Sequence, residues 1–206
     1  LDVLDKLQPA LEDGKSARTV TLTDDERVVA RGFFLPTMKP TIYAANVDEA
    51  TLSEGAEKNA HVRTVQEIAA SESAECVVIC AQLEAELVEL PLDERGAYLE
   101  ALGVVGSGVG RLIQSAYRLL GLMSFLTAGE KEVRAWTIPR GTRAPQAAGT
   151  IHSDIERGFI RAEIVSYDDL TRAGSYAAAR EQGLLRLEGK EYVMQEGDIV
   201  NFRFNV

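Results

Sequence analysis

A polar segment that directly follows an apolar run holds the residues of this chain best suited to reading a nucleotide base. The run spans residues 41–45, and the segment after it is Asn46, Val47, Asp48 and Glu49. A side-chain amide both donates and accepts hydrogen bonds, whereas a carboxylate only accepts them. We interpret the segment as the base-reading half of a nucleotide site at the end of a strand. The alternative is that Asn46 is only a turn residue.

The phosphate-binding half of such a site is absent from the sequence pattern. A P-loop needs Gly-x-x-x-x-Gly-Lys-Ser/Thr after a strand, so that backbone N–H groups close around the phosphates. The nearest match is Gly14-Lys15-Ser16, but Pro9 stands where the first glycine belongs. Leucines at positions 1, 4, 7 and 11 have helical spacing. We therefore expect Gly14 to end a helix.

The cysteines and histidines favour structural roles. Cys76 and Cys80 lie in one apolar run, where extended backbone would separate them by about 13 Å, too far for a disulfide. We expect buried thiols. His61 and His152 are the only histidines and have no partner at metal-ligand spacing, so we expect surface or capping roles. No metal site is predicted.

Composition indicates a globular chain whose two parts differ in charge. The 206 residues are 46% hydrophobic and 26% charged, with a net charge of −10. Residues 1–121 hold 11 Lys+Arg against 20 Asp+Glu, and residues 122–206 hold 11 against 12, which gives −9 and −1. This asymmetry predicts two units with different partners. Neither a membrane span of roughly 18 apolar residues nor a signal peptide is seen, so we expect a cytoplasmic protein without membrane binding.

The first part is expected to alternate strands and helices. The pattern predicts a helix over 2–13 and a second helix from the capping box of Thr23 and Glu26 to Pro36. It then predicts a strand over 40–45, an acidic loop through Glu54, a helix around 62–69, a strand over 76–81 and a helix over 83–90. The continuous apolar run 76–81 is typical of a strand in a parallel sheet. This order indicates a βαβα unit.

The glycine-rich segment 106–110 follows a short helix expected near 93–102. Arg111 occupies the third glycine position of a dinucleotide motif and no strand precedes the segment, so we expect a link that opens a helix. From Gly129 onward the pattern predicts strands over 133–138, 159–167, 184–187, 192–195 and 199–204, with helices near 145–156 and 176–182. A small mixed sheet that grips a helix, as in a β-grasp fold, fits this order.

Several motifs together resemble the YchF subfamily of Obg-like ATPases. They are KPTIYAANVDE (39–49), QLEAEL (82–87), FLTAG (125–129), KEVRAWTI (131–138), APQAAG (144–149), GFIRAE (158–163) and NFRFNV (201–206). The resemblance spans essentially the whole chain but enters the family's sequence partway. It implies that residues 1–37 are part of a helical arm, residues 38–121 the closing part of an α/β nucleotide-binding domain with a parallel P-loop NTPase sheet, and residues 122–206 a TGS domain, which is an α+β, ubiquitin-like β-grasp module.

The resemblance also implies how a base would be read. Relatives of the family recognise guanine with Asn-Lys-x-Asp, where the Asp accepts bonds from N1–H and the 2-amino group; adenine has an acceptor at N1, so a fixed carboxylate would be repelled. Glu49 occupies the Asp position, and its longer side chain can turn aside, leaving Asn46 and the backbone near Val47 to contact adenine. This implies a preference for ATP over GTP. Residues 80–82 take the place of the family's second base-contacting loop, which adds Ala81 and Gln82 to the predicted site. Cys80 and Gln82 depart from the Ser and Lys often found in that loop, so a backbone contact is expected there and not a side-chain contact.

As the resemblance implies, the parent protein would be a monomeric, ribosome-associated ATPase that uses ATP and Mg²⁺. Its phosphate, metal and catalytic residues would precede Leu1, so residues 1–206 alone should not hydrolyse ATP. The alternative is a non-catalytic RNA- or protein-binding module that acts through residues 122–206. In that part Arg140 and Arg143 flank a turn and are candidates for ribosomal RNA phosphates. Trp136 could stack on RNA, although a tryptophan on a strand is more often part of the core.

Overall fold

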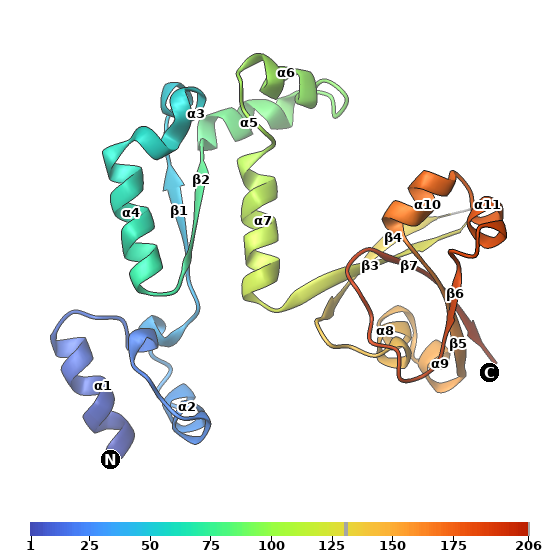
Figure 1. The fold of residues 1–206 in the computed structure, drawn as a ribbon. Helices are drawn as coiled ribbons and strands as arrows, with labels where there is room; N and C mark the ends of the chain where they lie inside the picture. The colour runs from blue at the N-terminus through green and yellow to red at the C-terminus, as the bar shows by residue number, and fades with distance from the viewer. Residues whose placement is uncertain (130–131, 206) are drawn as a thin grey trace. The chain divides into compact units, whose positions relative to one another are not determined.

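The computed structural model describes residues 1–129 and 132–205 and divides into two compact units, Leu1–Leu119 and Leu120–Val206 (Figure 1). We call them the N-terminal unit and the C-terminal unit. The predicted fold class, mixed α/β with a parallel strand pair followed by an α+β sheet, is confirmed. In the described residues no helix combines the length and the apolar character needed to cross a membrane.

The N-terminal unit begins with short helices that enclose a small core. They are α1 (Asp2–Glu12), η1 (Ala17–Thr19), α2 (Asp24–Arg31) and η2 (Pro36–Met38), and their buried residues are Val3, Leu7, Ala17, Leu22 and Ala30. Gly14 has a left-handed backbone (φ +72°), and Lys15 N–H donates to the carbonyl of Ala10 at 2.8 Å. The expectation that Gly14 ends a helix is confirmed, so the nearest P-loop match follows a helix and not a strand.

Helix α2 starts as predicted but ends earlier than predicted. Thr23 accepts a hydrogen bond from the backbone of Glu26, and the Glu26 carboxylate accepts one from the backbone of Thr23, which confirms the capping box. The helix stops at Arg31, and the extension to Pro36 is wrong. Gly32 lies at its C-terminus and Phe34 adopts a positive φ of 53°, which a helix cannot include.

A parallel strand pair forms the centre of the rest of this unit. Strand β1 (Ile42–Asn46) pairs with β2 (Glu75–Ile79), and α3 (Glu49–Gly55), η3 (Ala56–Lys58) and α4 (Ala60–Ser71) connect them. Helices α5 (Ala81–Glu89), α6 (Arg95–Ala101) and α7 (Gly108–Leu119) follow β2. In Figure 1 the two strands lie between α4 and α7, both of which contact β1 and β2. The predicted βαβα order with parallel strands is confirmed.

Two sequence predictions in this region are wrong. The expected acidic loop is helix α3, because the Asp48 side chain caps it by accepting from Thr51 N–H at 2.8 Å. The second strand was expected to reach residue 81, but it ends at Ile79 and Ala81 already belongs to α5. Cys80 therefore precedes a helix, so the two cysteines do not share a strand. Cys80 is buried as predicted, whereas Cys76 is only partly buried, and burial raises the pKa of the Cys76 thiol.

The C-terminal unit is a five-stranded mixed sheet in the order β4-β3-β7-β5-β6. Its elements are β3 (Leu122–Ala128), β4 (Val133–Pro139), α8 (Ala144–Ile151), α9 (Ser153–Arg157), β5 (Phe159–Ser166), α10 (Tyr167–Ala173), α11 (Tyr176–Glu181), β6 (Arg186–Glu188) and β7 (Asp198–Phe204). Strands β3 and β7 run parallel, and the other pairs are antiparallel. The central strand of the sheet is thus contributed by the end of the described chain.

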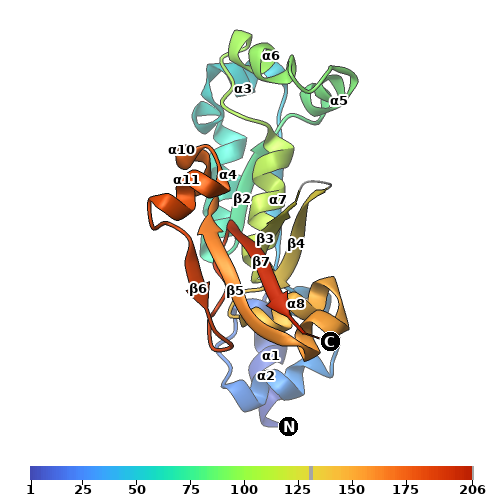
Figure 2. The ribbon, with the colours of Figure 1, turned by 90° about the vertical axis from the view of Figure 1, so that its right-hand side faces the viewer.

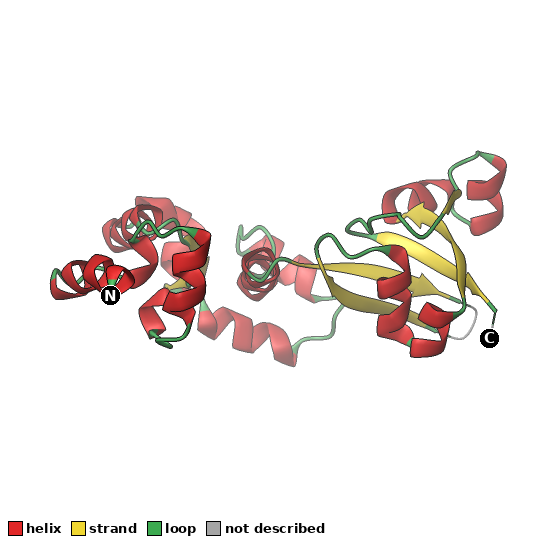
Figure 3. Cartoon of the chain, turned by 90° about the horizontal axis from the view of Figure 1, so that it is seen from below, coloured by secondary structure: helices red, strands yellow, loops and turns green. Residues whose placement is uncertain are grey.

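Helices cover both faces of this sheet (Figure 3). Helix α8 packs on the first face over a core that includes Met123, Phe125, Ile138, Ala147, Ile164, Val200 and Phe202. On the second face, α10 and α11 pack over one end through Val165, Ala179, Ile199, Leu126, Leu170 and Leu184. The second face is thus partly covered by helices whose apolar contacts are confined to one end of the strands.

The sequence predictions for this unit miss β3 and α10. The apolar run of β3 directly follows α7 and resembles a continuation of that helix. The strand expected over 192–195 is reduced to one bridge between Val193 and Arg143. The single helix expected over 145–156 is broken into α8 and α9 at His152, whose extended backbone interrupts the helix.

Candidate functional site

The two segments predicted to read a base meet where the parallel strands end. The Asn46 Oδ1 atom accepts a hydrogen bond from Ala81 N–H at 3.0 Å, and Val47 N–H donates to the carbonyl of Ile79 at 2.9 Å. Because β1 and β2 are parallel, their carboxyl ends share one edge, which is where α/β sheets bind ligands. Asn46 and Ala81 are exposed there and Val47 is partly exposed.

These bonds determine which groups remain for a ligand. The N–H groups of Val47 and Ala81 already have partners, so the backbone contact expected near Val47 would have to come from a carbonyl. The Asn46 amide nitrogen has no hydrogen-bond partner among the described residues, so both of its N–H groups can donate outward. Gln82 donates from Nε2 to Glu86 at 3.3 Å, which leaves its carbonyl oxygen as an acceptor. The edge therefore offers one amide donor and one amide acceptor.

Glu49 lies in the first turn of α3 and is exposed. The neighbouring carboxylate, Asp48, caps the helix, and hydrogen bonds from the hydroxyl and backbone of Thr51 lower the pKa of Asp48. The Asp48 carboxylate thus caps the helix, whereas the exposed Glu49 carboxylate takes no part in the cap. The sequence predicted Glu49 on a loop; the helix fixes its backbone and leaves its three side-chain torsions free to move the carboxylate.

A cavity of about 530 Å³ lies along β1 and reaches the same strand end. It is lined by Tyr43, Ala44, Ala45, Asn46, Val47, Asp48, Thr51, Asn59, His61, Val62 and Val65. His61 is exposed on α4, as expected, and its place on the cavity wall was not predicted. The walls combine apolar strand residues with the polar groups of residues 46, 48 and 59.

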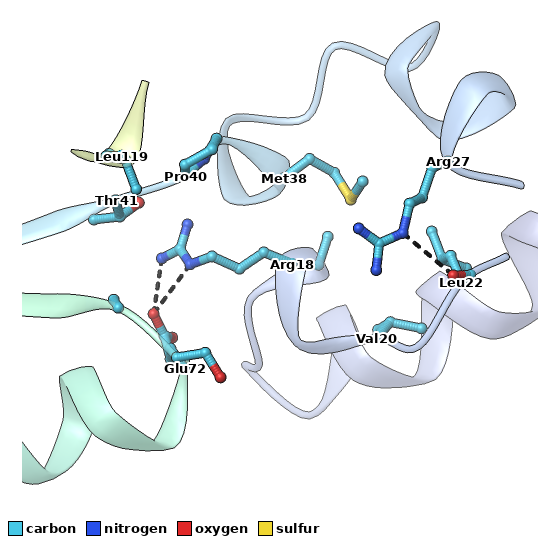
Figure 4. A pocket seen from close by; sticks show the side chains of 12 residues that line it. Arg18, Val20, Leu22, Arg27, Met38, Pro40, Thr41, Glu72 and Leu119 are labelled. Atoms are coloured by element: carbon cyan, nitrogen blue, oxygen red, sulfur yellow. Dashed lines mark hydrogen bonds and ion pairs between the residues drawn. The ribbon is translucent and has the colours of Figure 1, made fainter. Parts of the chain in front are cut away.

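A carboxylate network ties β1 to the N-terminal helices. Glu72 accepts hydrogen bonds from Ser16 (2.7 Å), Tyr43 (2.8 Å) and Arg18 (2.9 Å). The hydroxyl of Ser16, then that of Tyr43 and the Arg18 guanidinium, lower the pKa of Glu72 to about 2. Figure 4 shows Arg18 reaching Glu72 across a cavity of about 250 Å³. No sequence pattern signals this network, because its members are up to 56 residues apart.

The glycine-rich segment starts a helix, as predicted. Glu84 on α5 accepts from Ser107 Oγ at 2.7 Å and from Gly108 N–H at 2.5 Å, at the N-terminus of α7. A Cβ atom at Gly108 would lie 3.2 Å from the Ile79 side chain, so glycine permits this close approach. The element before this segment is α6, so the prediction that no strand precedes it is confirmed.

The three residues predicted to contact RNA have protein partners. Trp136 Nε1 donates to Thr127 at 2.9 Å, and the Arg134 guanidinium stacks 4.1 Å from the Trp136 ring. Arg140 pairs with Glu196 at 3.3 Å, and Arg143 pairs with Glu191 at 2.8 Å. Each arginine is matched by one exposed carboxylate. The structure does not bring these residues into one cluster of unmatched positive charge.

No group of three or more His, Cys, Asp or Glu side chains is arranged to hold a metal within residues 1–129 and 132–205. His152 Nδ1 instead accepts a hydrogen bond from Asp154 N–H at 3.1 Å and caps α9. A capping role is one of the two roles that the sequence predicts for the histidines. Within the described residues, the strand edge at Asn46 is the site that best matches the sequence motifs.

Comparison with known proteins gives one consistent result. The family model YchF-GTPase_C, described as a protein of unknown function (DUF933), matches residues 122–205. The "Ribosome-binding ATPase YchF" of Bacillus subtilis (strain 168) is 49% identical over all of this chain and 56% of that protein, and that of Escherichia coli O157:H7 is 45% identical over the same shares. The chain belongs to the YchF family.

A solved YchF structure agrees with this assignment. The YchF GTPase of Schizosaccharomyces pombe matches with a TM-score of 0.80 and 31% identity over 98% of this chain and 53% of that one. The chain thus spans about half the length of the YchF proteins that it matches. The bacterial relatives are named ATPases and the yeast protein a GTPase, so the names alone leave the choice of base open.

Proposed function

We propose that this chain supplies the base-reading part and a ribosome-docking module of a P-loop ATPase that prefers ATP to GTP. The observation that carries the proposal is the hydrogen bond between Asn46 Oδ1 and Ala81 N–H, which joins the two base-reading segments at the carboxyl edge of parallel strands. The names of the relatives support the ribosomal role. Phosphate, Mg²⁺ and catalytic groups would come from a part of the protein that precedes Leu1.

The chemistry at the edge favours adenine. An Asn46 N–H group can donate to N7 of a purine, and the free carbonyl oxygen of Gln82 can accept from the 6-amino group of adenine, where guanine instead has an oxygen acceptor. Glu49 can swing its carboxylate away from N1 of adenine. A shorter Asp held at that position would meet the N1–H and 2-amino donors of guanine. Unpaired polar groups cost roughly 1–3 kcal/mol, enough to decide the preference.

The proposal is tested by Glu49→Asp in the full-length protein that carries this segment. We expect the ratio of GTP to ATP affinity to rise by about tenfold, because roughly 1.4 kcal/mol of selectivity would be lost. Calorimetric titration with ATP and GTP measures both affinities. Glu54→Asp, an exposed change on the same helix, is the control and should leave the ratio unchanged. An unchanged ratio in Glu49→Asp would rule out this role for Glu49.

The second candidate is a non-catalytic module that acts through residues 122–206, as a TGS domain would. The separate core of the C-terminal unit favours it, because that unit has the contacts expected of an independent domain. The two candidates differ in the parent protein: only the first requires phosphate release from ATP. Both place the protein in the cytoplasm, as a monomer, and both assign residues 1–37 to a helical arm and 38–121 to the nucleotide-binding domain.

A further inference from the structure

The second face of the C-terminal sheet changes character along its strands. At one end Val165 and Ile199 pack under α10 and α11. Because side chains alternate between faces, the same face continues through Glu163 and Arg161 on β5 and through Asn201 and Arg203 on β7. Figure 2 shows these two strands side by side with α10 and α11 near one end. Beyond the helices, this face is charged and polar.

A bulge in β5 places two arginines opposite each other. Phe159 pairs with Phe204, and Arg161 pairs with Arg203, so β5 has one extra residue between these pairs. The bulge lets Phe159 enter the core on the first face while Arg161 points to the second face. Directly opposed side chains on paired strands have Cβ atoms about 4.5–5.5 Å apart, and like charges there are destabilising.

One carboxylate is shared by two of the three arginines at this position. Arg203 lies 3.1 Å and Arg180 of α11 lies 4.0 Å from the same oxygen, Oε2 of Glu163. The Glu163 side chain is 12% exposed, whereas those of Arg180 and Arg203 are 68% and 52% exposed. Arg161 is exposed and has no hydrogen bond or ion pair with another described residue. The cluster therefore presents about two unmatched positive charges to solvent, unlike the paired Arg140 and Arg143.

A cavity of about 340 Å³ adjoins the cluster and is lined by Ala128, Glu163, Tyr176, Ala177, Arg180, Leu185, Asn201 and Arg203. Tyr176 offers a ring on which a base can stack, and the Asn201 amide can donate or accept. Burial raises the pKa of Tyr176, so its hydroxyl remains a donor at neutral pH. Positive charge, an aromatic ring and an amide thus lie together on one face.

We propose that Arg161, Arg180 and Arg203 bind the phosphodiester backbone of single-stranded RNA, with Tyr176 stacking on a base. This inference rests on the proposed docking function and names its contact site. One guanidinium group can donate two parallel hydrogen bonds to the oxygens of a phosphate. An RNA phosphate bound between Arg161 and Arg203 would also relieve the repulsion between these two side chains. An acidic protein segment would satisfy the charge but would not need the ring of Tyr176, which favours RNA.

The test measures binding of a fluorescein-labelled oligouridylate to the chain of residues 1–206 by anisotropy over a range of salt concentrations. We expect the double variant Arg161→Gln and Arg203→Gln to bind at least about tenfold more weakly. The slope of log affinity against log salt should become shallower by about 0.7 for each phosphate that is no longer neutralised. Glu163→Gln should strengthen binding, because it removes the negative charge that opposes the phosphates. Tyr176→Leu should weaken binding at every salt concentration.

The control is the double variant Arg157→Gln and Arg172→Gln, which removes the same charge from two exposed, paired arginines of the same unit. It should bind nearly as the parent chain does; an equally weakened affinity would mean that only net charge matters and would overturn the proposal. Competition by polyglutamate as effective as that by RNA would overturn it in favour of a protein partner. Fluorescence of Trp136 monitors folding, and removal of the opposed arginines should not lower the melting temperature.

Failure of this inference can be told apart from failure of the docking function. If the chain co-sediments with ribosomes and the double variant Arg161→Gln and Arg203→Gln does so equally, docking stands and the arginine site is wrong. If the parent chain does not co-sediment but binds oligouridylate through these arginines, the site stands and ribosome docking by this chain is wrong.

Discussion

Each of the two units has an apolar core of its own, but polar contacts between elements contribute differently to the two. The C-terminal unit has a five-stranded sheet with a large apolar core on one face. The N-terminal unit has only two paired strands among its described residues, and the link from β1 to its first helices depends on hydrogen bonds and ion pairs of Glu72 with Ser16, Arg18 and Tyr43. A sheet of only two parallel strands offers little apolar surface to bury against the helices. We infer that polar contacts matter more for the N-terminal unit and apolar packing for the C-terminal one.

The largest expected effect is the loss of stability when a core side chain of the C-terminal unit is removed. Phe125 is fully buried and packs edge to face on Phe202 at 6.0 Å. Phe125→Ala should lower the free energy of unfolding of this unit by about 3–5 kcal/mol. Trp136 is the only tryptophan, so its fluorescence during urea unfolding follows this unit. Val133→Ala, at an exposed site on β4, should change stability by less than about 0.5 kcal/mol. A Phe125→Ala chain as stable as its parent would refute the assigned core.

A second prediction concerns Glu72 and has a defined pH dependence. Glu72→Gln should cost the N-terminal unit about 1–3 kcal/mol at pH 7, because three donors would no longer have a charged acceptor. The folded-state pKa of Glu72 is lowered to about 2, so its ionised form stabilises the fold above the ordinary pKa, and this stability is lost as pH falls toward 2. The difference between parent and variant should therefore shrink from pH 5 to pH 2.

Circular dichroism follows this change, because helices α1 to α7 all belong to the N-terminal unit and dominate the helical signal. Glu67→Gln, on the exposed side of α4, is the matched control for Glu72, which directly follows that helix, and should cost little stability. A difference between Glu72→Gln and the parent chain that stays constant down to pH 2 would contradict the assigned ion pair. The Trp136 transition should not move, because Trp136 lies in the other unit.

The smallest expected effect is the loss of stability when one helix cap is removed in each unit. Thr23→Ala removes half of the capping box of α2 and should cost about 1 kcal/mol in the N-terminal unit. The Ser175 hydroxyl caps α11 by accepting a hydrogen bond from Ala178 N–H at 3.1 Å. Ser175→Ala removes this cap and should cost a similar amount of stability in the C-terminal unit. The first should alter the helical signal and the second the Trp136 signal. If both variants altered both signals equally, the units would not be independent.

Local chemistry explains which features the sequence could predict. The capping box of Thr23 and Glu26 and the end of α1 at Gly14 depend on residues a few positions apart, and both predictions were confirmed. Ala81 entered the predicted site through the family resemblance alone, and the parallel pairing of β1 with β2 shows how residues 46 and 81 come to meet. Helix α3 was missed because Asp48 looked like one of several loop acids, and β3 was missed because its apolar run continues from a helix.

Interactions between distant residues could not be predicted in this way. Glu72 meets Ser16 across 56 positions, and Glu163 meets Arg203 across 40. The opposition of Arg161 and Arg203 depends on a single extra residue in β5, which reverses the side-chain alternation without a clear mark in the sequence. The roles of Asn46, Val47, Glu49, Ala81 and Gln82 in binding remain predictions.

The hydrogen bond of Tyr43 has a mechanical consequence for the far end of β1. Tyr43 is anchored to Glu72, and Asn46 lies three residues further along the same strand, which corresponds to about 10 Å of extended backbone. Glu72 directly follows α4, so this bond fixes the start of β1 to the end of α4, and extended backbone resists stretching. The end of α4 thus helps to set where Asn46 lies at the far end of the strand.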